Sequence, residues 1–205
     1  MMSVRHSLAV VCALAAFAAV GAGAARPWPL ALAVIFHLLF AVTMAGVVLT
    51  SRAWSGPGFP FADGGWPSLR MMAWITPLTV LLQIGLGAAY RNQIVGAVPH
   101  VSWAFLTAIL AFALALFVLT QEQPHAPLRR WAYVLLAATG AQVLLGVLAF
   151  VARLSETPGP LTGAIHAHVG TGTIVLGAST AMSAWILRDA IPSSASTPAQ
   201  TGPHS

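Results

Sequence analysis

Residues 161–177 read LTGAIHAHVGTGTIVLG, and the apolar run continues without a charged side chain to residue 187. A helix needs roughly 20 apolar residues to cross the hydrocarbon core of a bilayer, and this run is long enough. The segment is therefore predicted to be a transmembrane helix. Its two histidines, His166 and His168, are ring side chains that an apolar span does not require, so they indicate a function inside the membrane.

The whole chain has the composition of a membrane protein. It has 205 residues, of which 58% are hydrophobic and only 6% are charged, and its mean hydropathy is +0.84. These values exclude a soluble globular domain. We expect an all-α integral membrane protein with five to six transmembrane helices, at residues 8–25, 28–50, 71–90, 100–120, 131–152 and 161–187.

The first of these stretches has two interpretations. Arg5 and His6 precede an apolar run that ends in AVGAGAA, which fits either a transmembrane helix or a secretory signal peptide.

The positions of the spans divide the chain into segments. We expect four segments: the N-terminal helix or signal peptide (1–27), a transmembrane helix and a cytoplasmic loop (28–70), a four-helix bundle (71–190) and a disordered tail (191–205).

The arginines predict how the chain is oriented in the membrane. All nine basic residues are Arg, and cytoplasmic loops are enriched in them. With the N-terminus inside, six arginines are cytoplasmic and three, Arg26, Arg91 and Arg153, are outside. We therefore expect a multi-pass protein of the plasma (inner) membrane with both termini cytoplasmic if the first span is uncleaved. The net charge of +5 reflects this orientation and its contact with membrane lipid, and no nucleic-acid partner is expected.

A weak internal repeat organises residues 71–190. The third and fourth spans carry Gln83 four residues before Gly87, then an Arg and a His, and the fifth and sixth spans carry Gln142 four residues before Gly146 in the same order. Two such two-helix units predict an up-down bundle in which alternate helices lie diagonally across the core. The fourth and sixth spans would then face each other.

Counting residues from the cytoplasmic ends compares the depth of the histidines. His100 lies 21 residues before Gln121, and His168 lies 20 residues before Arg188. At about 1.5 Å per residue the two imidazoles are at nearly one level. His166 and His168 point about 200° apart on a helix, so only one of them can face His100. His168 is preferred by its register, and His166 is the alternative.

Two imidazoles that face each other across a bundle predict axial ligands of a haem iron. Arg91 and Arg153 lie at the same outer rim, where they would pair with the propionates. His37 is about 8 Å deeper and does not share this level, so a helix-to-helix hydrogen bond is its simpler role. Several glycines would either leave room for a flat macrocycle or allow close helix packing: Gly85, Gly87, Gly146, Gly170 and Gly172.

Five motifs in this order resemble the heme A synthase family of cytochrome oxidase assembly proteins. They are HLLFAVTMAGVVLTSRAW (37–54), LQIGLGA (82–88), PHVSWAF (99–105), QVLLGVLAF (142–150) and AHVGTGTIVLGAS (167–179), within residues 30–188. The family has two four-helix halves, and this chain is similar to the C-terminal half plus one preceding helix. The resemblance implies that His100 and His168 bind one haem b per chain, and that His37 matches a ligand of the missing half.

The chain also departs from the family. The Thr-Gly-Ser-Gly turn, the outer loop with a cysteine pair and the Glu before a His-Arg dipeptide are absent from the sequence, so the catalytic residues stay unknown. We expect a bis-histidine haem b membrane protein that acts in electron transfer, haem A biosynthesis or oxidase assembly, with a redox partner or assembly factors. One alternative is an active synthase, an oxidoreductase that acts on haem O to give haem A, as a homo-oligomer in which His37 helps to hold the substrate. Another is an assembly subunit without haem.

Overall fold

The computed structural model describes residues 29–50, 59–61, 66–121, 126–154 and 162–192. Within them lie five long helices and two short strands. The helices are α2 (Leu30–Thr50), α3 (Leu69–Arg91), α4 (Ala97–Leu119), α5 (Ala126–Leu154) and α6 (Thr162–Asp189). All five are long and apolar enough to cross a membrane. The multi-pass membrane fold is thus confirmed for the described part of the chain, while the prediction for residues 8–25 lies outside it.

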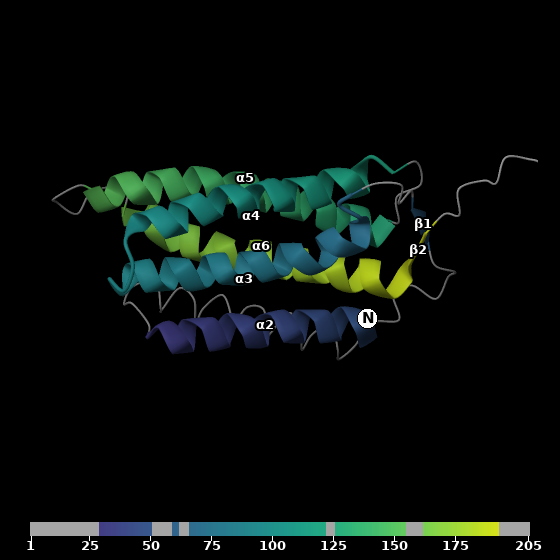
Figure 1. Cartoon of the computed structure of the whole chain (residues 1–205), viewed down its shortest axis with the longest axis horizontal. Coiled ribbons are helices and arrows are strands. Elements are labelled where there is room, and N and C mark those ends of the chain that lie inside the picture. Colours follow the sequence, from purple (N-terminus) through teal and green to yellow (C-terminus); the bar gives the residue numbers. More distant parts are fainter. Residues whose placement is uncertain (1–28, 51–58, 62–65, 122–125, 155–161, 193–205) are drawn as a thin grey trace, which may run out of the picture.

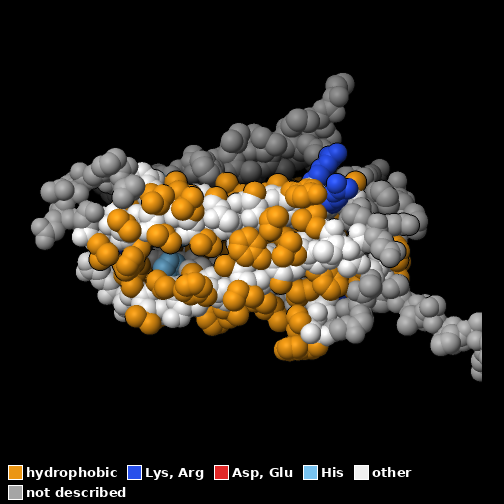
Figure 2. All heavy atoms as spheres, turned by 90° about the horizontal axis from the view of Figure 1, so that it is seen from above, with side chains coloured by type: hydrophobic (Ala, Val, Ile, Leu, Met, Phe, Trp, Pro, Cys, Tyr) orange, Lys and Arg blue, Asp and Glu red, His pale blue; other side chains and the backbone are white. Residues whose placement is uncertain are grey.

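The helices run side by side along the long axis of the molecule (Figure 1). Helix α3 contacts α4 and α6, and α5 contacts the same two helices, so α4 and α6 lie diagonally across the group of four. Helix α2 packs outside this group, against α6 and α3. The face in Figure 2 is apolar along most of its length, and the Lys or Arg side chains visible on this face lie near one end.

Helix α6 is the central helix. Its residues from Val175 to Ile186 are all buried, whereas few residues of α2 and α5 are buried. Many of its side chains are small, namely Gly, Ala, Ser and Thr, and small residues let neighbouring helices approach closely in a membrane. Two of its buried hydroxyl groups bond within the helix, from Ser179 Oγ to the Leu176 carbonyl at 3.0 Å and from Ser183 Oγ to the Ser179 carbonyl at 2.8 Å. The Thr180 hydroxyl has no hydrogen-bond partner within the described part of the chain.

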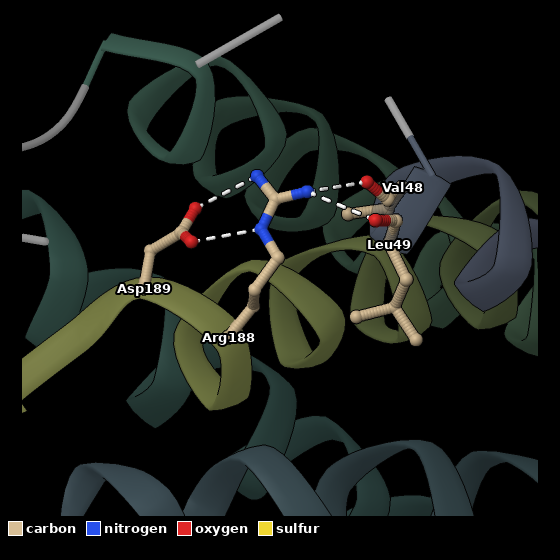
Figure 3. Close-up of polar contacts among 4 residues, drawn as sticks. All are labelled: Val48, Leu49, Arg188 and Asp189. Atoms are coloured by element: carbon tan, nitrogen blue, oxygen red, sulfur yellow. Dashed lines mark hydrogen bonds and ion pairs between the residues drawn. The ribbon is translucent and has the colours of Figure 1, made fainter. Parts of the chain in front are cut away.

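Arg188 joins α6 to the end of α2 (Figure 3). Its guanidinium donates to the Val48 carbonyl at 2.7 Å and is paired with the Asp189 carboxylate at 2.8 Å. The last carbonyls of a helix have no partner within that helix, so a cation placed there satisfies them. This contact fixes α2 against the bundle.

Two strands at the same end differ from the all-helical expectation. Strand β1 (Phe59–Phe61) pairs in parallel with β2 (Ala190–Pro192). Arg70 donates to the Ala190 carbonyl at 2.7 Å, which supports this pairing. The predicted disordered tail from residue 191 therefore begins two residues too early, because Ile191 and Pro192 are held in β2. Residues 193–205 lie outside the described part of the chain.

Candidate functional site

The side chains of His100 and His168 meet in the interior of the bundle. His100 extends from α4 and His168 from the diagonal helix α6. Their ring centroids are 6.4 Å apart, and the two ring planes are perpendicular, at 90°. Both imidazoles are partly buried. The structure thus brings together the two histidines that the residue counts placed at one level.

His166 lies elsewhere. It is two residues before His168 on α6 and its side chain is exposed. Because two residues turn a helix by about 200°, a helix that directs His168 inward directs His166 outward. Of the two alternatives left by the sequence, His168 is the one that faces His100.

Each imidazole of the pair rests against a Gln and a Gly of the preceding helix. The side-chain amide nitrogen of Gln83 lies 3.0 Å from His100 Nδ1, and that of Gln142 lies 3.4 Å from His168 Nε2. His168 Nδ1 also donates to the Gln142 carbonyl at 3.2 Å. The sequence showed Gln83 and Gln142 as a repeated pattern without a role, and the structure places both beside the histidine pair.

The glycines divide into different roles. A methyl group at Gly87 would lie 2.9 Å from His100 Cε1, and one at Gly146 would lie 3.1 Å from His168 Cε1. These two glycines therefore make room for the imidazoles. Gly172 faces the Gln142 amide and Gly85 faces Val34 on α2, which is helix packing. Gly170 is buried.

Tyr90 is a residue of this site that the sequence reasoning missed. Its ring is stacked on His100, with the centroids 6.1 Å apart and the planes 15° from parallel. The Arg153 guanidinium lies over the Tyr90 ring, 4.5 Å from its centroid. The spacing from Gln83 through Gly87 to Tyr90 is i, i+4, i+7, which places all three on one helix face. This spacing is the feature of the sequence from which Tyr90 could have been assigned to the site.

The end of the bundle where α3 and α5 terminate carries two positive charges. Arg153 is exposed at the end of α5, and Arg91 is half-buried at the end of α3. The Arg153 guanidinium lies over the ring of Tyr90, the residue next to Arg91, so the two arginines lie at the same end of the bundle. A pair of arginines beside an apolar interior favours a ligand with acidic groups.

His37 does not join the pair. It is buried, its Nδ1–H donates to the Ala33 carbonyl at 2.7 Å, and its Nε2 accepts from the Thr173 hydroxyl at 3.1 Å. Thr173 lies five residues beyond His168 on α6, or roughly 7.5 Å along the helix axis. Both nitrogens of His37 are thus used within the chain, in a bond that joins α2 to α6.

The distance between the two imidazoles can be compared with the distance that binding to one haem iron requires. An imidazole nitrogen binds a transition metal at about 2.0 Å, so two imidazoles on opposite sides of one ion have ring centroids about 6 Å apart, close to the 6.4 Å here. No group of three or more His, Cys, Asp or Glu side chains occurs among the described residues. Two imidazoles suffice when a macrocycle supplies the remaining ligands. The residues present therefore fit a haem iron.

Gln83 Oε1 and Gln142 Oε1 have no hydrogen-bond partner within the described part of the chain, and the same holds there for the hydroxyl oxygens of Thr76, Thr139 and Thr180. These oxygens are acceptors, and a haem offers them no donor. They therefore carry no argument for or against a haem.

Comparison of the chain with protein-family models, with curated proteins and with solved structures finds no match.

Proposed function

We propose that this protein is a bis-histidine haem membrane protein, with one haem b per chain held between His100 and His168. The observation that carries the proposal is the imidazole pair, which extends from diagonal helices with ring centroids 6.4 Å apart. Haem bound through two imidazoles cycles between two oxidation states, which suits electron transfer and disfavours oxygen binding. The partner would be a redox protein or an oxidase assembly factor.

The residues of the chain have separate roles in this proposal. His100 and His168 would hold the iron, and Arg91 and Arg153 would pair with the propionates. The two-helix repeat explains why one Gln, one Gly and one His recur in the same order on each side of the site.

The resemblance of residues 30–188 to heme A synthases supports the proposal of a role in haem A biosynthesis or cytochrome oxidase assembly. An active synthase that uses His37 for its substrate in a homo-oligomer is less well supported, because both ring nitrogens of His37 are engaged within the chain. An assembly subunit without haem is the remaining alternative, and the test below separates it from the proposal.

The test is an absorption spectrum of the detergent-purified protein, oxidised and then reduced. We expect a low-spin b-type spectrum with about one haem per chain. His100→Ala and His168→Ala should each abolish the low-spin species, because one axial position is then open. His166→Ala is the matched control on the same helix, and it should keep the spectrum. A colourless protein would favour the assembly subunit, and loss of haem in His166→Ala alone would exchange the ligand assignment.

A further inference from the structure

The contacts of His168 define a seat for its imidazole. The Gln142 carbonyl can only accept a hydrogen bond, so the 3.2 Å contact places the ring proton on Nδ1. Nε2 then carries the lone pair that an iron would take, so the seat rests on the Nδ1 contact and not on the Gln142 side-chain amide, which lies 3.4 Å from Nε2. Gly146 completes the seat, because a methyl group there would lie 3.1 Å from the ring. Gln142 and Gly146 together hold one imidazole in one orientation.

The contacts of His100 define a second seat, on α3. The Gln83 side-chain amide lies 3.0 Å from Nδ1 and 3.5 Å from Nε2. Gly87 is the residue against which the ring packs. Since a side chain on a helix leans toward the N-terminus, any side chain at position 87 would cover the turn that begins at Gln83. The glycine is therefore required for the ring to reach this turn.

Tyr90 adds a third contact to His100. Its ring is nearly parallel to the imidazole, at 15°, and the Arg153 guanidinium lies 4.5 Å above the Tyr90 ring. Aromatic stacking of this kind resists rotation of the ring about its side-chain bond. The stack joins α5, α3 and α4 at the outer end of the histidine pair. It fixes the plane of His100 independently of the seat.

We propose that Gln83 with Gly87, Gln142 with Gly146, and Tyr90 are positioning residues that hold the planes of His100 and His168 crossed at 90°. This inference rests on the proposed haem site and specifies the electronic state of the iron in it. The angle between the two imidazole planes decides how the d orbitals of a ferric iron are split. Residues that orient metal ligands tune the metal and its affinity in this way.

The test is electron paramagnetic resonance of the oxidised, detergent-purified protein. Crossed imidazole planes give a low-spin ferric signal dominated by one very large g value, whereas parallel planes give three resolved g values. We expect the crossed-plane signal in the unmodified protein. Gly146→Ala and Gly87→Ala should lose it and lower the haem affinity by about 10- to 100-fold.

Each variant has a matched control on its own helix. Gly140→Ala on α5 meets no described atom within 4 Å, and Gly85→Ala on α3 would only touch Val34 at 3.7 Å. Both should keep the signal and the affinity. Tyr90→Phe keeps the aromatic ring and should keep the signal, whereas Tyr90→Leu removes the stack and should shift the signal toward resolved g values. The Tyr90 pair tests the inference even if the glycine variants fold poorly.

The outcomes separate this inference from the proposed function. Low-spin haem with three resolved g values in the unmodified protein would overturn the crossed-plane inference and leave the haem site in place. The inference also fails if Tyr90→Leu and the two seat variants keep the crossed-plane signal. A colourless unmodified protein would overturn both proposals.

Discussion

The bond between His37 and Thr173 gives a quantitative prediction about helix packing. His37 Nε2 accepts from the Thr173 hydroxyl at 3.1 Å, across the interface between α2 and α6. Two single variants, His37→Ala and Thr173→Ala, and the double variant form a cycle that isolates this contact. If His37 serves packing rather than haem binding, all three variants should keep one haem per chain.

The expected magnitudes follow from burial and from the bond. An interhelical hydrogen bond in a membrane contributes about 0.6 kcal/mol on average and at most about 1.7 kcal/mol. We expect the coupling energy of the cycle in that range. Removing the buried His37 ring also leaves a cavity, so the single variant should lose about 2–5 kcal/mol in total, as large-to-small changes in cores do.

The assay is unfolding in mixed micelles with a rising share of denaturing detergent, followed by helix content and by haem absorbance. Val42→Ala is the control, because Val42 lies on α2 with 62% of its surface exposed and should change the free energy of unfolding little. A coupling energy of zero would show that the 3.1 Å contact carries no stability. Loss of haem in His37→Ala would show that His37 belongs to the haem site.

Two further predictions concern the packing and orientation of the helices. Gly177→Ala would place a methyl group 3.1 Å from Phe40 Cε1 on α2, so it should lower the free energy of unfolding by about 1–3 kcal/mol. Gly46→Ala is the control, because a methyl group there meets no described atom within 4 Å. Equal effects of the two variants in the same detergent titration would contradict this packing. A reporter fused after Ser205 should be cytoplasmic, and one inserted at residues 155–159 should lie on the opposite side of the membrane. The reason is that six of the nine arginines are cytoplasmic in this orientation. The reverse pattern would place Arg91 and Arg153 in the cytoplasm.

The sequence by itself determined the spans of the bundle. The five helices α2 to α6 lie where the apolar stretches predicted them, with ends that differ by a few residues. Length and apolarity are local properties, and the bilayer selects helices for any such stretch because every backbone group must be bonded within it. The depth of His100 and His168 also followed from counting residues, since the rise of a helix is constant.

Only the tertiary structure decided what each helix face contacts. Neither the stack of Tyr90 on His100 nor the seats at Gly87 and Gly146 could be read from the sequence, and the partner of His37 is a threonine 136 residues away. In a soluble protein the apolar stripe of a helix shows which side is inside. Lipid is as apolar as the core of this bundle, so its helices carry no such stripe, and their rotation is set by close packing of small residues and by a few polar contacts.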